Sequence, residues 1–187
     1  SIVLNLDAQT YQNWLNYTHS QQVRDIDVHG DDIWVVTQGG LIKYNKQTAG
    51  KEYFNRANSN LPGNNLLSVL CSSNNNIWIT NRHYGIGKFK NSECTIYNVS
   101  NSSLPFNQWN MKILEDSKNN IWISSFRWMT RFDGKNWKTW ITGSDFSAFP
   151  AITSFDIDGN DVVWMFSSDG IGKIENDEYS VVSLVGS

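Results

Sequence analysis

The stretch "NNIWIS", Asn119 to Ser124, decides the fold, because the chain contains it four times in closely similar forms. The other copies are "NNIWIT" at 75–80, "DDIWVV" at 31–36 and "DVVWMF" at 161–166. Their tryptophans follow one another at intervals of 44, 44 and 42 residues. A period of that size indicates a repeat architecture, in which each repeat is one supersecondary unit. The four tryptophans are Trp34, Trp78, Trp122 and Trp164.

Each repeat contains four predicted strands. Apolar residues three apart open the unit, and a polar hairpin turn such as "SSNNN" or "DSKNN" precedes the tryptophan strand. A third strand ("GLIKYN", "GIGKFK", "WMTRFD", "GIGKIE") and a fourth ("KEYFN", "CTIYNV", "NWKTWI", "EYSVVS") complete the unit. The prolines lie at the junctions between units, where a missing amide donor is tolerated. Four short strands per repeat predict an all-β fold built of β-propeller blades.

The tryptophans are predicted to be structural. A single four-stranded blade cannot bury both of its faces, so it must pack on the next blade. A large aromatic side chain recurring once per blade supplies much of that surface. We therefore expect Trp34, Trp78, Trp122 and Trp164 to lie between blades.

The repeats define the expected domain boundaries. Residues 2–18, "IVLNLDAQTYQNWLNYT", align with the third and fourth strands of a unit. The sequence thus predicts an N-terminal half-blade at 1–18, followed by four complete blades at 19–61, 62–105, 106–149 and 150–187. Three arrangements fit this count: a segment of a longer array with further blades, a chain that closes by self-association, and a four-bladed ring with two spare strands. An open array would expose an apolar blade face and unpaired strand edges.

Composition excludes several classes of function. The formal net charge is -3, so no basic field is available to hold a nucleic acid. No window of 18 apolar residues predicts membrane insertion, and no signal peptide is visible. Cys71 and Cys94 fall on the first and fourth strands of one predicted sheet. Those strands lie about 14 Å apart, beyond disulfide reach, so we expect free thiols unless the two pair across molecules.

The second and third units resemble the two-component regulator propeller repeat. The resemblance rests on "NLPGNNLLSVLCSSNNNIWITNRHYGIGKFKN" and "NSSLPFNQWNMKILEDSKNNIWISSFRWMTRFDGKNWKTW". The chain departs from the family where Trp128-Met129 replaces Gly-Leu. It also departs where the glycine after Ile-Trp-Ile is replaced by Val36, Thr80, Ser124 and Phe166.

That resemblance implies a function and a location. Members of the family are largely extracytoplasmic sensor regions of hybrid histidine kinases in glycan-degrading bacteria, where the propeller recognises sugar-chain fragments. It therefore implies a bacterial protein, periplasmic or extracellular, that takes part in signal transduction and carbohydrate binding. No kinase, membrane helix or immunoglobulin-like connector accompanies these repeats, so signalling is implied only through the relatives.

A ligand is expected on the face where the loops between second and third strands emerge together with the blade junctions. Loops on a rigid frame are where binding residues concentrate. Two of these loops, "NRHYG" and "SFRW", are unusual in combining arginine with aromatic residues, which can pair with acidic groups and stack on sugars. Trp128 and Tyr84 can equally fill the space between blades. The candidate ligand-binding residues are Arg82, His83, Tyr84, Arg127 and Trp128 on the loops, with Arg56, Asn58, Asn107 and Trp109 at the junctions.

Catalytic and metal-binding patterns are weak. The acidic stretches at 27–32 and 156–161 fall in hairpin turns and do not match an EF-hand loop. The histidines lack metal-ligand spacing, so we predict no metal, no cofactor and no catalytic residue. We favour a recognition module that binds an oligosaccharide or a protein partner. A propeller-type lyase with His83 or Tyr84 as base is one alternative, and an architectural interaction array is another.

Overall fold

Four antiparallel sheets of four strands each account for the regular structure in residues 22–105, 110–145 and 151–184, the ranges that the computed structural model describes. The prediction of an all-β chain of four-stranded blades is confirmed. The half-blade expected at 1–18 lies outside the described residues.

The first two sheets contain β1 (Val23–His29), β2 (Asp32–Thr37), β3 (Leu41–Asn45) and β4 (Lys51–Phe54), then β5 (Leu66–Cys71), β6 (Ile77–Asn81), β7 (Ile86–Lys90) and β8 (Glu93–Tyr97). The last two contain β9 (Asn110–Glu115), β10 (Ile121–Ser125), β11 (Trp128–Phe132) and β12 (Trp137–Ile141), then β13 (Ser154–Ile157), β14 (Val163–Ser167), β15 (Gly170–Glu175) and β16 (Glu178–Leu184).

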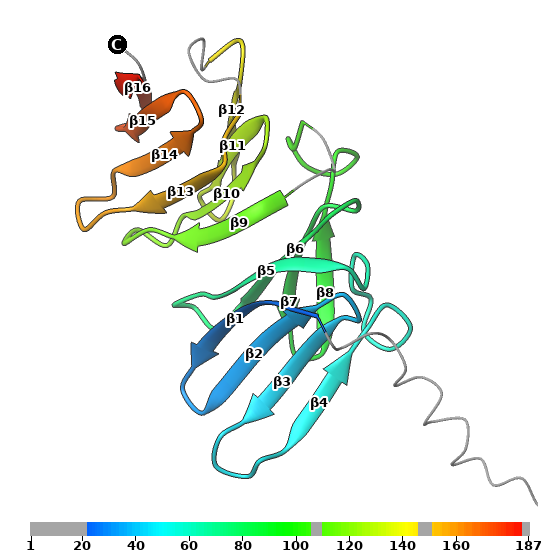
Figure 1. Cartoon of the computed structure of the whole chain (residues 1–187). Coiled ribbons are helices and arrows are strands. Elements are labelled where there is room, and N and C mark those ends of the chain that lie inside the picture. The colour runs from blue at the N-terminus through cyan, green and yellow to red at the C-terminus, as the bar shows by residue number, and fades with distance from the viewer. Residues whose placement is uncertain (1–21, 106–109, 146–150, 185–187) are drawn as a thin grey trace, which may run out of the picture.

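The sheets stand in a row in chain order. Within each sheet every strand pairs with the strand that follows it in sequence. The first strands of successive sheets lie side by side, β1 beside β5, β5 beside β9 and β9 beside β13. Figure 1 shows the β1–β4 sheet at one end of this row and the β13–β16 sheet at the other.

The hairpin before each tryptophan strand is built from turn residues that the sequence repeats. In three of these turns a residue with positive φ lies three positions before the tryptophan: Asn75 at 60°, Asn119 at 64° and Asp161 at 62°. Asn and Asp enter this left-handed region more readily than other side chains. The first sheet has a shorter turn, because His29 pairs directly with Asp32 across Gly30 and Asp31.

Two of the tryptophans are fastened to the turn that precedes them. The Trp122 indole donates to Asp116 Oδ2 at 2.8 Å, and the Trp164 indole donates to Asp158 Oδ2 at 2.9 Å. The hydrogen bond from Trp164, followed by those from the backbone amides of Asn160 and Val162, lowers the pKa of Asp158. A carboxylate in the turn thus sets the orientation of the ring that the next strand presents.

Apolar clusters fill the spaces between consecutive sheets. Trp34 contacts Phe89 of the second sheet with ring centroids 5.8 Å apart, and Trp78 contacts Phe132 of the third at 5.7 Å. Trp122 stacks on Trp140 at 5.5 Å and shares a cluster with Phe155 of the fourth sheet. These three tryptophans are buried, whereas Trp164 of the last sheet is only partly buried.

A cation lies over each of the three buried tryptophan rings. The third strand places it directly across from the indole, with Lys43 over Trp34 at 5.8 Å, Lys88 over Trp78 at 5.6 Å and Arg131 over Trp122 at 5.6 Å from the ring centroid. A cation in this position adds a modest attraction to the ring face. Lys173 pairs across from Trp164 in the same way, but its ammonium contacts Glu175 at 2.6 Å.

Side chains of one sheet bind the open edge of the next. Asp25 accepts a hydrogen bond from the Val69 amide at 3.0 Å, and Asp27 accepts one from the Cys71 amide at 2.7 Å. Between the third and fourth sheets, Lys112 Nζ donates to the Phe155 carbonyl at 2.7 Å. Polar groups that an isolated sheet would leave open on its first strand are thereby satisfied.

Cys71 and Cys94 are free thiols, and both pack against the cluster between the first and second sheets. Burial raises the pKa of each thiol to about 12, with the nearby Asp27 carboxylate adding to the effect at Cys71. Both side chains are therefore protonated at neutral pH and behave as small apolar groups.

Replacing Asp116 by alanine should lower the free energy of unfolding by about 2 to 3 kcal/mol, because buried donors lose their acceptor. Asp116 is 8% exposed and accepts hydrogen bonds from the Lys118 and Asn120 amides and from the Trp122 indole. Urea denaturation measures the change. The matched control is Asp133→Ala, in an exposed turn where the carboxylate accepts from two backbone amides. Equal losses in the two variants would contradict the account.

The two thiols should react slowly with a thiol reagent while the protein is folded. A pKa of about 12, against 9.0 for a free thiol, leaves roughly a thousandfold fewer thiolates at a given pH. Labelling at pH 8 with a chromogenic disulfide should therefore be much faster in denaturant than in buffer. Rapid labelling of either cysteine in the native protein would contradict the prediction, because it would show that this thiol is accessible.

Candidate functional site

The loops that connect second to third strands share one edge of the row with the junctions between sheets. This follows from antiparallel pairing, since alternate connections of such a sheet leave from opposite edges. The candidate residues on the described parts of these loops and junctions therefore belong to one face. Below, that face is called the loop face, and the opposite one, which carries the hairpin turns, the turn face.

Asn81 fixes the loop between β6 and β7. Its side-chain oxygen accepts hydrogen bonds from the amides of His83 at 2.9 Å and Tyr84 at 3.1 Å. Its side-chain nitrogen donates to the Asn65 carbonyl at 2.9 Å, which ties the loop to the junction between the first two sheets. Asn81 itself is buried, so the loop rests on a support that solvent does not reach.

The junction approaches this loop at Gly63. A Cβ added there would lie 2.7 Å from Asn81 Nδ2 and 2.9 Å from a Tyr84 ring carbon. Such separations are too short for a side chain, so Gly63 is required by the close approach of the two segments. The turn motif "LPG" thus positions a loop residue as well as ending a blade.

Arg56, His83 and Tyr84 come together on the loop face and are called the Tyr84 cluster here. The Arg56 guanidinium lies 5.6 Å from the Tyr84 ring centroid, and the His83 and Tyr84 ring centroids are 6.3 Å apart. Tyr84 is 52% exposed, and Arg56 and His83 are exposed as well. The backbone of Arg56 is held by a hydrogen bond from its amide to Asn64 Oδ1 at 2.7 Å.

Two other predicted residues near this cluster have different positions. Arg82 is partly buried beside it. Asn58 shapes the junction turn, because its side chain accepts from the Asn55 amide at 2.8 Å and donates to the Tyr53 carbonyl at 2.9 Å. We therefore assign Asn58 a structural role.

The loop between β10 and β11 presents Arg127 and Phe126. Both are exposed, and Phe126 is an aromatic side chain that sequence reasoning did not select. The backbone is held on both sides, by the Thr142 amide donating to the Arg127 carbonyl and the Ile152 amide donating to the Phe126 carbonyl, each at 2.9 Å. Asn107 and Trp109 lie outside the described residues.

Trp128 does not lie on the exposed surface of this loop. It is 1% exposed and packs in the cluster between the second and third sheets with Trp78 and Leu104. It occupies the position of Gly40, Gly85 and Gly170 in the other repeats, which adopt φ of 134°, 99° and 155°. Of the two expectations for Trp128, the structure favours space-filling between blades over contact with a ligand.

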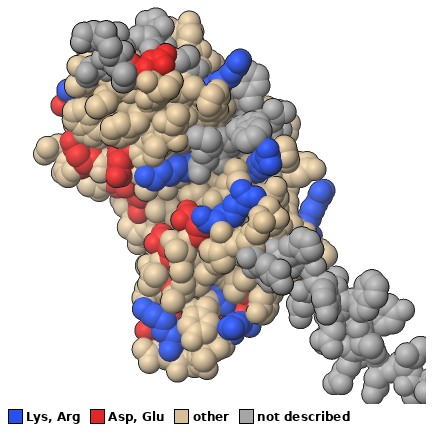
Figure 2. Space-filling view, in the orientation of Figure 1, with Lys and Arg blue, Asp and Glu red and all other residues tan. Residues whose placement is uncertain are grey.

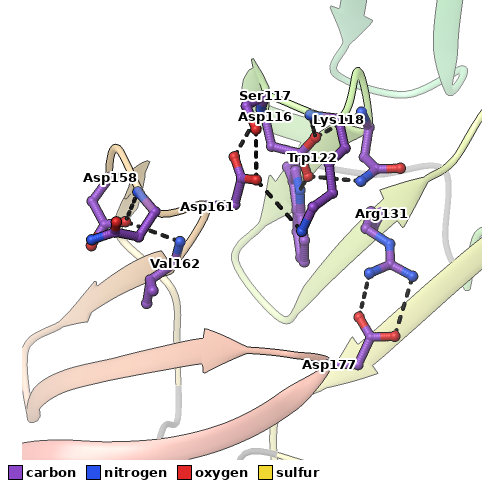
Figure 3. A network of polar contacts seen from close by, with 11 residues as sticks. Asp116, Ser117, Lys118, Trp122, Arg131, Asp158, Asp161, Val162 and Asp177 are labelled. Atoms are coloured by element: carbon purple, nitrogen blue, oxygen red, sulfur yellow. Dashed lines mark hydrogen bonds and ion pairs between the residues drawn. The ribbon is translucent and has the colours of Figure 1, made fainter.

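The turn face carries a polar network between the third and fourth sheets, shown in Figure 3. Asp161 accepts hydrogen bonds from the Ser117 amide at 2.8 Å and hydroxyl at 2.7 Å, which together lower its pKa. Arg131 reaches across to both carboxylate oxygens of Asp177. Asp161, Arg131 and Asp177 border a hollow of about 350 Å³. Their charges are paired with one another across the seam, so we assign the network to sheet packing.

Within residues 22–105, 110–145 and 151–184 no group of three or more His, Cys, Asp or Glu side chains is placed to hold a metal ion. None of the elements in those ranges is a helix able to span a membrane. Figure 2 shows a face on which charged side chains of both signs are dispersed among uncharged ones.

Comparison with known families places one segment of the chain. Residues 103–127 match the family described as two component regulator propeller. This segment contains β9, β10 and the loop that ends at Arg127. Comparison with curated proteins gave no match.

Several solved structures share the fold. The extracellular domain of a one component system from B. thetaiotaomicron is similar with a TM-score of 0.70 and 21% identity, over 86% of this chain and 22% of that one. The extracellular domain of a hybrid two component system from the same organism gives 0.73 and 18%, over 86% and 23%. Virginiamycin B lyase from Staphylococcus aureus gives 0.71 and 14%, over 89% and 57%.

The chain spans about a fifth of the length of the two B. thetaiotaomicron domains that it resembles. At these identities the likeness establishes the fold, which is that of propeller proteins with different activities. The family match concerns residues 103–127. The chain is therefore a row of β-propeller blades in which this segment matches the two component regulator propeller family.

Proposed function

We propose that the chain is a non-enzymatic recognition module of an extracytoplasmic sensor, and that it binds a glycan fragment on its loop face at the Tyr84 cluster. The observation that carries this proposal is an exposed aromatic side chain on a loop whose backbone binds the buried side chain of Asn81, with an arginine beside the ring. Each part of the arrangement supplies a different component of sugar recognition.

Tyr84 offers apolar ring surface and a hydroxyl. The C–H faces of a sugar pack on aromatic rings, and a hydroxyl can exchange hydrogen bonds with sugar hydroxyls. The hydrogen bonds from the His83 and Tyr84 amides to Asn81 order the loop before a ligand arrives. Ordering a loop in advance reduces the entropic cost of binding.

Arg56 supplies directed donors. Its guanidinium packs over the Tyr84 ring. A guanidinium has five N–H donors in a fixed plane and can bind a carboxylate or sulfate through two parallel hydrogen bonds. The cluster therefore suits a glycan that carries uronate or sulfate groups.

Arg127 is proposed as a second contact. It is exposed on the loop of the third sheet, beside the exposed ring of Phe126. Asn107 and Trp109, from the preceding junction, remain candidates for the same region. Trp128 is left out of the proposed surface because its side chain is buried.

The sensor role is supported by the matched repeat and by two structures of similar fold. Both structures are extracellular domains of bacterial one component or two component systems. We propose a comparable extracytoplasmic location for this chain, with the blades forming part of the ligand-sensing region. A protein partner on the loop face is the competing form of the proposal, and the experiment below separates the two.

A lyase activity is the second candidate, because virginiamycin B lyase has a similar fold. A lyase needs a general base activated by a carboxylate or a metal. In the described structure the loop that carries His83 and Tyr84 is anchored by the side-chain oxygen of Asn81, which accepts from the backbone amides of both residues. This support orders a binding loop, whereas activating a base would call for an ionised partner. Recognition is therefore the better-supported function.

Isothermal titration calorimetry against acidic and neutral oligosaccharides should identify a ligand whose affinity depends on the Tyr84 cluster. Tyr84→Ala and Arg56→Ala should each weaken binding about tenfold or more, equivalent to about 1.4 kcal/mol. Arg56→Lys should restore only part of the affinity for an acidic glycan, because lysine keeps the charge but loses the paired hydrogen bonds.

The control for the tyrosine change is Tyr44→Ala, since Tyr44 lies near the turn-face end of β3, with its ring beside Lys51 of β4. Arg24→Ala, at an exposed position of β1, is the control for Arg56. A ligand whose affinity is unchanged by both cluster variants would show that the site is misplaced. Binding to a protein partner through the cluster, with no glycan bound, would overturn the choice of ligand.

A further inference from the structure

The two end sheets of the row each turn an apolar face outward, and no described element covers either face. In the first sheet, Ile33 and Val35 point away from Trp34, as alternation along β2 requires. Their cross-strand partners Val28 and Ile26 continue this face. Ile26 is 56% exposed and Val28 51%, unusually high for adjacent branched apolar residues on one sheet.

In the last sheet the outward face carries the tryptophan. Val163 and Met165 of β14 belong to the cluster shared with the third sheet. Trp164 and Phe166, which alternate with them, therefore point outward. Phe166 is 40% exposed, and Trp164 is the one tryptophan of the four repeats without a place in a described inter-sheet cluster.

These two faces correspond to the two halves of the interfaces inside the row. Between the first and second sheets, Trp34 and Val36 pack with Val69, Ile77 and Ile79. Counted by register from the tryptophan, Trp164 and Phe166 occupy the places of Trp34 and Val36. The same register compares the outer face of the first sheet with the face of the second sheet that packs on Trp34. Three positions match: Ile26 corresponds to Val69, Ile33 to Ile77 and Val35 to Ile79.

The polar contacts of the internal interfaces also have counterparts on the end faces. Asp156 pairs across from Trp164 as Asp27 does from Trp34, and each accepts the next backbone amide through Oδ1. In Asp27 the second carboxylate oxygen binds the Cys71 amide of the following sheet. Asp156 is exposed, so its second oxygen is directed at no following sheet within the described ranges.

The turns repeat the match. Ser117, five residues before Trp122, donates to Asp161, three residues before Trp164. Gly159 and Asp31 occupy the same two places, five before Trp164 and three before Trp34, so the backbone amide is the donor that Gly159 shares with Ser117. Asp31 is exposed and has its carboxylate available beside a single Gln47 contact.

We propose that a second copy of this chain docks head to tail, with the outer face of its β1–β4 sheet on the outer face of the β13–β16 sheet of the first. The interface continues the sheet stacking already present in the row, and it does not depend on the proposed glycan site. Such an interface uses two different surfaces, so it is heterologous and allows further copies to add until the assembly closes. It differs from a symmetric dimer, in which one face would meet itself.

Sedimentation velocity over a hundredfold concentration range tests association. The wild-type chain should form dimers and larger species as its concentration rises. Ile26→Lys and Phe166→Lys each place a charge on one exposed face, and each should remove species larger than a monomer. Thermal denaturation verifies that both variants fold. Phe126→Lys, an exposed aromatic on the loop face, is the control and should associate like the wild type.

Mixing the two interface variants gives the decisive result. Ile26→Lys keeps an intact β13–β16 face and Phe166→Lys keeps an intact β1–β4 face, so an equimolar mixture should form one-to-one dimers and nothing larger. A wild-type chain that stays monomeric throughout would overturn the proposal. So would a mixture that fails to dimerise, or association by either variant alone, which would indicate that like faces pair.

Discussion

A four-stranded sheet with apolar residues on both faces can bury them only when another sheet packs on each face. Repetition of the tryptophan strand solves this between consecutive sheets, because Trp34, Trp78 and Trp122 each belong to a cluster shared with the sheet that follows. Carboxylates and a lysine from one sheet also satisfy backbone groups on the open edge of the next. Blade stability is therefore a property of pairs of sheets.

The ring contacts of the repeated tryptophans between sheets do not use the loop face, so residues on that face can differ from one repeat to the next. The tryptophans, their cations and the hairpin turns hold the sheets together away from the loops between second and third strands. Asn81 and Gly63 then adapt one junction to present Arg56, His83 and Tyr84, a combination found in no other repeat of the sequence. Function placed on such loops can change without disturbing the frame.

The period of the sequence was sufficient to predict the sheets, their strand order and the lack of a bridge between Cys71 and Cys94 within the chain, because turn chemistry and alternation act locally. Side-chain placement at the loops was less predictable. Trp128 was an equal candidate for ligand contact and packing, and only the neighbouring sheet, with Trp78 and Leu104, decides that it is buried. Phe126 was passed over for the same reason, since its exposure depends on which residue of "SFRW" turns inward. The joining of Arg56 to Tyr84 crosses a junction that no local pattern describes.

The contacts that reach the first strands of the second and fourth sheets come from the preceding sheet, whereas the turns bind backward, through Glu115 to Ser73 and through Asp161 to Ser117. Asp25 and Asp27 reach forward to the second sheet, and Lys112 reaches forward to the fourth. On a ribosome the earlier sheet emerges first, so its carboxylates are in place when the next strand leaves the exit tunnel. The first sheet is thus suited to vectorial assembly, because its carboxylates are ready to accept the amides of the second sheet as that sheet is made. In a nascent chain of this design, the carboxylates of Asp25 and Asp27 face the growing end, where synthesis supplies the sheet whose amides they accept.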